Sequence, residues 1–209
     1  MCLPITKIGS AVLRKKCSKL SPAALNHPRL GRFLSAMVAT MRKARGVGLS
    51  ANQAGRGIKA IVLECRSNKR YPARPDFPLQ IYLNPSIVKY SGAKSLEWEG
   101  CLSIPGYRGL VPRARQITLR ALSANGTPVL KKFSGFEARV VQHEVDHLNG
   151  LFYTDRMKDF YSWMHLDEFN SRFHSRIQLP VGHAVRTTVL SCQYRLKTQH
   201  RHALTVLQG

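Results

Sequence analysis

Two stretches of the chain carry apolar residues at helical spacing. In residues 26–46 the apolar positions are Leu30, Phe33, Leu34, Met37, Val38 and Met41. In residues 136–148 they are Phe136, Val140, Val141, Val145 and Leu148. Intervals of three and four residues place each set on one face of an α-helix. Gly46 and Asn149-Gly150 are suitable residues to end the two helices.

Most of the chain between these helices favours β-strands. Residues 58–65 form a short apolar run, and residues 79–92 contain one or two short strands. Residues 115–135 predict two strands around a turn that contains Asn125-Gly126. Residues 67–78 form a Pro-rich loop, and residues 5–16 alternate like a first strand and turn.

The order of these elements indicates the fold class. A helix, several strands and a second helix follow one another, without internal repeats or regular strand–helix alternation. This predicts an α+β fold with mixed or antiparallel sheets around the helix of the C-terminal half. A chain of 209 residues suits one domain with an appendage. Because residues 169–209 lack acids and clear periodicity, we expect a folded domain over 1–168 and a basic, partly disordered extension over 169–209.

The formal net charge is +22, from 33 Lys and Arg against 11 Asp and Glu, and no acid precedes Glu64 or follows Glu168. Such a charge suits either a solvated basic surface or contact with a polyanion such as ribosomal RNA, and the sequence leaves both open. No apolar run is long enough to span a membrane. The five cysteines are widely spaced, which favours a reducing compartment. We expect a monomer.

The sequence His143-Glu144-Val145-Asp146-His147 lies on the second predicted helix. Two His residues four positions apart share one face of a helix, so both rings can bind one metal ion. Glu144 could then act as a base on water. A catalytic site of this kind requires a third protein ligand. Cys101 upstream and Glu168 downstream are the two candidates, and Glu168 would indicate a zinc protease.

Two further segments bear on this choice. Residues 99–109 place Cys101 between Gly100 and Leu102, and a thiolate with two imidazoles completes a tetrahedral site with one free position. Residues 46–53 contain two glycines that allow close backbone approach to a ligand. The segment ends in Gln53, whose side-chain amide could donate a hydrogen bond to a developing oxyanion.

Together the three segments resemble the signature motifs of the peptide deformylase family. They read GVGLSANQ (46–53), EGCLS (99–103) and QHEVDHLNG (142–150), and they occur in the family's order. The resemblance extends from about residue 5 to residue 168. Ser50 and Asn52 depart from the residues usual in the first motif, and no part of the terminal forty or so residues matches the family core.

The resemblance implies a role for each residue at a matching position. Cys101, His143 and His147 would be the ligands of one divalent metal ion, typically Fe²⁺, with Zn²⁺, Ni²⁺ or Co²⁺ able to replace it. Glu144 would be the general base and acid, and Gln53 with the backbone N–H of Leu102 would hold the oxyanion. Substrate would contact Gly48, Val47 and Arg108, and Glu99 and Arg113 would form a structural ion pair. Candidates for the methionine pocket are Val47, Leu49, Val140 and Tyr107.

The implied reaction is metal-dependent hydrolysis of the formyl group from the N-formyl-methionine of nascent peptides, with release of formate. The basic surface and tail would suit docking on the ribosome. The compartment would be the bacterial cytoplasm, with a mitochondrion or plastid as the alternative. A basic RNA- or ribosome-binding protein with a relic site is the non-enzymatic alternative, but the intact set of site residues speaks against it.

Overall fold

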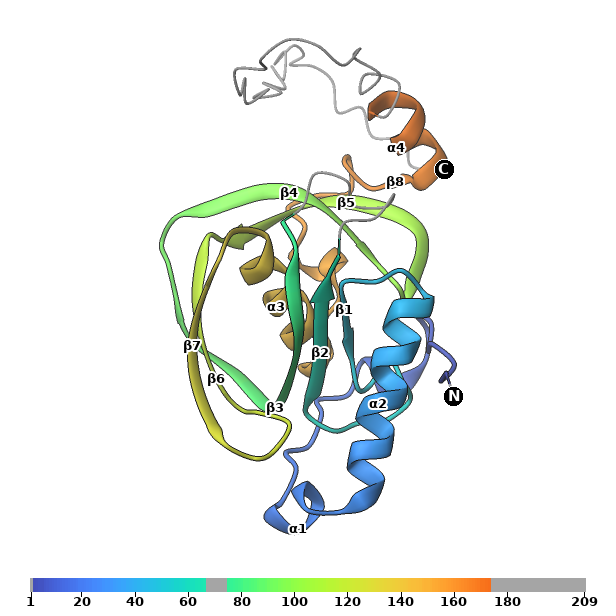
Figure 1. The fold of residues 1–209 in the computed structure, drawn as a ribbon. Coiled ribbons are helices and arrows are strands. Elements are labelled where there is room, and N and C mark those ends of the chain that lie inside the picture. The colour runs from blue at the N-terminus through green and yellow to red at the C-terminus, as the bar shows by residue number, and fades with distance from the viewer. Residues whose placement is uncertain (1, 67–74, 174–209) are drawn as a thin grey trace, which may run out of the picture.

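The computed structural model describes residues 2–66 and 75–173, which fold around two antiparallel sheets (Figure 1). The five-stranded sheet has the order β1 (Gly48–Ser50), β2 (Ala60–Cys65), β3 (Phe77–Tyr90), β6 (Gln116–Leu122) and β7 (Pro128–Ser134). The three-stranded sheet contains β4 (Lys94–Cys101), β5 (Ile104–Ala114) and β8 (Met164–His165). The α-helices are α1 (Pro22–Leu25), α2 (Pro28–Lys43), α3 (Gly135–Leu148) and α4 (Leu166–Phe173). This arrangement confirms the predicted α+β class.

Strand β2 lies between α2 and α3, and all six of its residues are buried. Its alternate side chains point to opposite faces of the sheet. Ile61 and Leu63 pack with α3, whereas Ala60 and Val62 pack with α2. A strand covered on both faces reads as a continuous apolar run, which explains why residues 58–65 were recognisable in the sequence.

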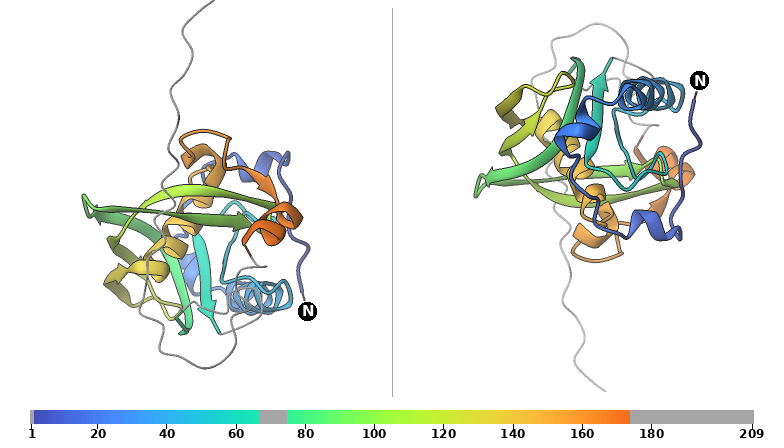
Figure 2. Two further views of the ribbon diagram at one scale, coloured as in Figure 1. Left: turned by 90° about the horizontal axis from the view of Figure 1, so that it is seen from above. Right: turned by 90° about the horizontal axis from the view of Figure 1, so that it is seen from below.

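Helix α3 also faces the second sheet. The side chain of Gln142 accepts a hydrogen bond from the Ala114 amide at 3.1 Å and donates to the Ala114 carbonyl at 2.9 Å. Arg139 donates to the Val111 carbonyl at 2.9 Å. These bonds attach the helix to the backbone of β5, and Figure 2 shows the long strands β4 and β5 crossing the molecule next to it.

The predicted helices are confirmed, with one difference at the end of the first. α2 ends at Lys43, and the residue with a left-handed backbone is Arg45 (φ 52°), not Gly46. The Gly46 amide bonds to the Met41 carbonyl at 2.9 Å and closes the helix. The predicted strands at 58–65 and 115–135 are confirmed as β2 and as β6 with β7. In the segment 79–92, residues 79–90 belong to one long strand, β3, which begins at Phe77.

The predicted first strand in residues 5–16 is wrong. The segment contains a 3-10 helix (Ala11–Leu13) and forms no ladder. In place of a ladder, the Thr6 amide bonds to the Gln53 carbonyl at 2.8 Å, and the Ile8 amide bonds to the Ser103 carbonyl at 2.9 Å. Residues 6 and 8 thus bridge two separate loops, so this N-terminal segment joins the first motif to the second.

The hairpin of β4 and β5 was not expected from the sequence. Pro105, Gly106, Gly109 and Pro112 interrupt β5 in the manner of a loop. Pro112 is tolerated because β8 pairs with β5 only at Tyr107 and Arg108, which leaves one side of the strand without a ladder at Pro112.

The expected domain boundary after Glu168 falls inside α4. Phe169 and Phe173 of this helix pack on Trp98 of β4, with ring centroids 5.0 and 5.4 Å away. Residues 169–173 are therefore part of the same packed unit, and the rest of the expected extension, 174–209, lies outside the described residues. Most of the expected Pro-rich loop also lies outside them. None of the described helices combines the length and the apolar character needed to cross a bilayer.

Candidate metal centre

Cys101 is the last residue of β4, directly before the two-residue turn Leu102-Ser103 that leads into β5. The register of the hairpin shifts between Glu99 and Cys101, and Cys101 pairs with Ile104. Such an irregularity bends a strand and redirects its side chains. The side chain of Cys101 is buried, and the Ser103 amide donates to its Sγ at 3.3 Å.

His143 and His147 approach Cys101 from α3. The Nε2 atom of His147 lies 3.2 Å from Cys101 Sγ, and one ligand atom from each of the three residues falls within 4.8 Å of the others. The other nitrogen of His143, Nδ1, lies 2.9 Å from a carboxylate oxygen of Glu99. A bond of this kind fixes the ring orientation of a metal-binding His. His147 Nδ1 is buried without a protein partner among the described residues.

The three side chains fit a transition-metal ion. Burial alone would raise the pKa of the Cys101 thiol, but the neighbouring His147 and His143 rings outweigh burial and hold its pKa well below the usual value. The thiolate is the form that binds metals. One thiolate and two imidazoles are a donor set that zinc and iron-group ions accept.

Glu144 points toward the same site and lies against β1. A Cβ atom added at Gly48 would lie 2.8 Å from Glu144 Cδ and Cγ, so any larger residue at this position would displace the carboxylate. Burial raises the pKa of Glu144, although His143 and His147 partly offset it. Its Oε2 atom has no hydrogen-bond partner among the described residues. The carboxylate is thus buried, unsatisfied and available to exchange a proton.

The amide of Gln53 is oriented by residues on both sides. Its Oε1 accepts hydrogen bonds from the Ser50 amide and the Ser50 hydroxyl, each at 3.0 Å. Its Nε2 therefore faces the site, where it lies 3.1 Å from Ser103 Oγ and 3.5 Å from Cys101 Sγ. Asn52 donates to the His147 carbonyl at 2.6 Å. Ser50 and Asn52, the two departures from the family pattern, both contact the site.

The turn after Cys101 is held from two directions. Lys7 Nζ donates to the Leu102 carbonyl at 2.9 Å, next to the bond between Ile8 and Ser103. The Leu102 side chain leans against Gly46, where an added Cβ would come within 2.8 Å of Leu102 Cδ1. The N-terminal segment and the residues after α2 therefore fix the backbone of this turn.

Behind the cysteine loop lies a buried ion network that the sequence revealed only in part. The expected pair of Glu99 and Arg113 is confirmed, with contacts of 2.9 and 3.0 Å. Arg139 adds a third contact to Glu99 at 2.7 Å, and Arg113 also binds Asp146. Arg156 in turn binds Asp146 at 2.7 and 3.1 Å. Glu99 thus connects this ion network to the metal ligand His143.

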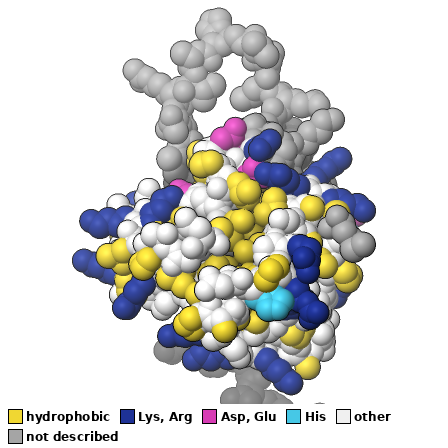
Figure 3. Space-filling view, turned by 60° about the horizontal axis from the view of Figure 1, so that its bottom comes forward, with side chains coloured by type: hydrophobic (Ala, Val, Ile, Leu, Met, Phe, Trp, Pro, Cys, Tyr) yellow, Lys and Arg dark blue, Asp and Glu magenta, His cyan; other side chains and the backbone are white. Residues whose placement is uncertain are grey.

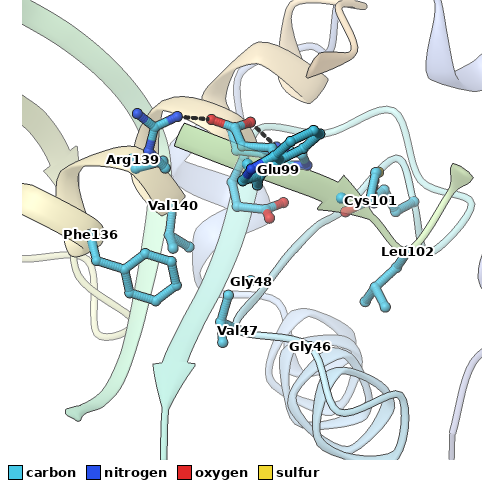
Figure 4. Close-up of a pocket in the computed structure, with 14 residues that line it drawn as sticks. Gly46, Val47, Gly48, Glu99, Cys101, Leu102, Phe136, Arg139 and Val140 are labelled. Carbon is cyan, nitrogen blue, oxygen red and sulfur yellow. Dashed lines mark hydrogen bonds and ion pairs between the residues drawn. The ribbon is translucent and has the colours of Figure 1, made fainter. Parts of the chain in front are cut away.

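An apolar pocket opens beside Cys101 and His143 (Figure 4). Its wall contains Val47, Phe136, Val140 and Trp98, and Gly48 and Glu144 line it as well. Two expected pocket residues lie elsewhere. Leu49 packs into the core against α2 because adjacent strand residues face opposite sides, and Tyr107 stacks on Trp163 at 4.3 Å.

Arg108 lies in a neighbouring cleft rather than in this pocket, with its guanidinium 4.9 Å from the Phe169 ring. Glu168 is exposed on α4 and pairs with Arg172 at 3.7 Å. It is not part of the three-residue cluster, so the structure supports Cys101 and not Glu168 as the third ligand.

The sequence pattern did not reveal two pocket residues, Phe136 and Trp98, or three residues of the ion network, Arg139, Asp146 and Arg156. Phe136 carried a usable signal, since it lies one helical turn before Val140 on the same face. Trp98, one residue before Glu99, had no such signal because the strand that contains it was not recognised.

Comparison with known proteins gives consistent results. The model of the family described as Polypeptide deformylase matches residues 2–163. Peptide deformylase 2 of Ralstonia nicotianae is 38% identical over 160 residues, which cover 77% of this chain and 89% of that protein. Peptide deformylase 2 of Bordetella bronchiseptica is 44% identical over 132 residues, which cover 63% of this chain and 75% of that protein.

Solved structures show the same likeness. A Met-Ala-Ser-bound class I type b peptide deformylase from Acinetobacter baumannii superimposes with a TM-score of 0.73 and 39% identity. The superposition covers 75% of this chain and 99% of that one. An actinonin-bound peptide deformylase from Synechococcus elongatus gives a TM-score of 0.68 at 30% identity, covering 81% of this chain and 85% of that one.

Proposed function

The chain belongs to the peptide deformylase family and is a metal-dependent hydrolase that removes the formyl group from N-formyl-methionine, and we propose that the residues around Cys101 perform this reaction as follows. Cys101, His143 and His147 hold one divalent ion. When bound, the ion supplies Lewis-acid chemistry that lowers the pKa of water and polarises the formyl carbonyl. The observation that supports this assignment is the close approach of the three ligand atoms, within 4.8 Å.

Glu144 carries the proton. Its buried carboxylate has a raised pKa and an oxygen without a partner among the described residues, two properties of a group that both accepts and donates a proton near neutral pH. It accepts a proton from the attacking water and delivers it to the nitrogen of the leaving amine. The C–N bond of the formamide breaks, and formate and a peptide with a free amino terminus remain.

Gln53 and the Leu102 amide stabilise the oxygen that becomes negative during the attack. Ser50 fixes the Gln53 carbonyl oxygen, so the Nε2–H bonds stay directed at the site. Lys7 and Ser103 fix the turn that contains the Leu102 amide. Donors that are already oriented cost no rearrangement when the charge develops.

Substrate binds with its methionine side chain in the apolar pocket and its backbone along β1. This strand is the edge of the five-stranded sheet, so Gly48 can pair with an extended peptide on its unpaired side. Val47, Phe136 and Val140 supply the apolar wall. The Met-Ala-Ser peptide bound to the Acinetobacter relative supports a formyl-methionyl peptide as the substrate here.

The remaining assignments follow the donor set and the charge. The family resemblance favours Fe²⁺ as the native ion, and the thiolate–imidazole donor set accepts Fe²⁺ as well as Zn²⁺, Ni²⁺ or Co²⁺ as replacements. The protein acts as a monomer on nascent peptides in the bacterial cytoplasm, with a mitochondrion or plastid as the alternative compartment. Its basic surface suits docking on the ribosome, and Figure 3 shows Lys and Arg side chains around a central hydrophobic area on one face.

Formate release from formyl-Met-Ala-Ser tests the function directly. The protein loaded with Fe²⁺ or Co²⁺ should turn the peptide over, and Cys101→Ser should lose both the metal and the activity, because an alcohol is a poor ligand at neutral pH. Metal content is measured alongside activity. A metal-loaded and active Cys101→Ser protein would contradict the ligand assignment, and a fully loaded wild type without turnover would indicate a relic site.

A further inference from the structure

A second cleft adjoins the metal centre and is lined by cations. It has a volume of about 640 Å³ and shares Cys101 and Leu102 with the apolar pocket. Its wall contains Lys7, Arg45 and Arg108, and none of the described residues that line it is acidic. A group leaving the metal centre past Leu102 would therefore enter a positively charged cleft.

Two of the three cations stand at the border between cleft and pocket. Lys7 is exposed and is held over the turn by its bond to the Leu102 carbonyl at 2.9 Å. Arg45 is exposed and is placed by its left-handed backbone at the end of α2. Neither forms an ion pair with an acidic residue in residues 2–66 and 75–173.

The third cation is fixed differently. Arg108 lies on β5, and its guanidinium lies over the Phe169 ring of α4, 4.9 Å from the ring centroid. Arg108 therefore adds positive charge to the cleft, but its guanidinium is already in contact with the Phe169 ring. The Arg45 side chain forms no hydrogen bond or ion pair with the described residues, and Arg45 lies nearest along the chain to β1, so it is the better candidate for contact with a ligand.

Consecutive residues connect the two spaces. Gly46, Val47 and Gly48 line the pocket, whereas Ala44 and Arg45 line the cleft. A peptide that begins beside Gly48 and Glu144 on the free edge of β1 and runs toward the N-terminal end of this strand would pass Gly46 and reach Arg45. Since paired strands advance together residue by residue, the methionine occupies the pocket and the third and fourth residues of the peptide reach the cleft.

We propose that Arg45, assisted by Lys7, makes this enzyme select formyl-methionyl peptides with acidic side chains at the third and fourth positions. The proposal rests on the function proposed above and adds a preference within the same site. A cleft lined by charges of one sign concentrates ligands of the opposite sign and lowers the energy of their complexes. Added salt screens this attraction, because the cations are exposed to solvent.

The test compares three amidated peptides: formyl-Met-Ala-Glu-Glu, formyl-Met-Ala-Ala-Ala and formyl-Met-Ala-Lys-Lys. The metal-loaded wild type should show kcat/KM about tenfold higher for the Glu peptide than for the Lys peptide. The difference should lie in KM, shrink at high salt and leave kcat unchanged. Arg45→Asp should reverse the preference. Arg45→Asn, which tolerates the left-handed backbone, should weaken it without adding negative charge.

Lys132→Glu is the matched control. Lys132 is exposed on β7, at the opposite edge of the sheet from β1, and this variant changes the net charge as much as Arg45→Asp does. It should keep the wild-type preference. Equal kcat/KM for all three peptides in an active wild type would overturn the proposal, and so would a preference that Arg45→Asp and Lys132→Glu alter equally. No turnover of any formyl peptide would instead contradict the proposed function.

Discussion

Helix α3 has two buried polar faces that differ in how fully their groups are bonded. Toward the ion network, Arg139, Gln142 and Asp146 bind charged or backbone partners, and among the described residues only the Nε atom of Arg139 is left without one on this face. Toward the metal centre, Glu144 and His147 each keep a buried atom without a partner in the part of the chain that the structure describes. Satisfied groups hold a structure in place, whereas unsatisfied buried groups are the ones free to bind ligands and move protons.

This difference predicts that substitutions on the two faces of α3 have different effects. Changes at the metal centre should remove activity and leave folding intact. Changes in the ion network should reduce stability first. Glu99 belongs to both, since it binds Arg113 and Arg139 and also orients His143.

The largest effect is expected for Glu144→Gln. Turnover should fall by about 10²–10⁴-fold, because the amide has nearly the same size but cannot carry the proton. Metal content should be unchanged. Since burial raises the pKa of Glu144, the folded state bears a cost for the charged carboxylate at neutral pH, so the melting temperature should stay equal or rise. Formate release, metal analysis and thermal unfolding check these points, and retained turnover would exclude Glu144 as the base.

Arg113→Leu should have the largest effect on stability. It leaves the carboxylates of Glu99 and Asp146 buried without their shared partner, at a cost of about 3–5 kcal/mol. Urea unfolding of the metal-loaded protein measures it. Arg172→Leu is the control, because it breaks an exposed pair worth about 0–1 kcal/mol. A similar loss in both variants would mean that the buried network is no more important than a surface pair.

Low pH should also reduce the contribution of the ion network to the stability of the protein. Burial alone would raise the pKa of Glu99 and Asp146, but Arg113 with His143 for Glu99, and Arg156 with Arg113 for Asp146, lower both below their usual values. A carboxylate with a lowered folded-state pKa contributes stability above its unfolded pKa, and this contribution is lost as pH falls through the folded pKa. The free energy of unfolding should therefore decline below about pH 4.

The same pH series in Arg113→Leu sharpens that prediction. Without the guanidinium the two carboxylates lose part of their pKa lowering, so the decline in the free energy of unfolding should be shallower than in the wild type. Urea unfolding of metal-free protein between pH 7 and 3 provides the comparison. Parallel curves for the two proteins would show that the acid sensitivity arises elsewhere.

The smallest effect is expected for Ser50→Ala. The variant removes the hydroxyl that donates to Gln53 Oε1 but keeps the backbone amide that donates to the same atom. Losing one of two such bonds should lower kcat by roughly 2–10-fold. Gln53→Leu, which removes the oxyanion donor itself, should cost about 10²–10³-fold. Equal losses in the two variants would mean that Ser50 does more than orient Gln53.

Elements were predictable where one chain segment carried its own pattern. The apolar spacing in α2 and α3 and the buried run in β2 follow from helix and strand geometry alone. The β4–β5 hairpin was not predictable, because Pro105 and Pro112 mimic a loop and are accommodated only through the pairing of β5 with its neighbours. The predicted first strand is wrong because the amides of residues 6 and 8 bond to two different loops, so this segment forms no ladder.

The sequence by itself determined the donors of the site. Cys101, His143, Glu144, His147 and Gln53 were identifiable because their types and spacings suit the chemistry, and two His one turn apart need only a helix to face together. Tertiary structure decided what joins them. The Gln53 amide and Cys101 are 48 residues apart in the chain, and Glu99 and Arg139 are 40 apart, so their contacts depend on how the sheets pack around α3. Packing likewise exposed Arg45 and Lys7 in the cleft beside Leu102, a placement that spacing along one chain cannot specify.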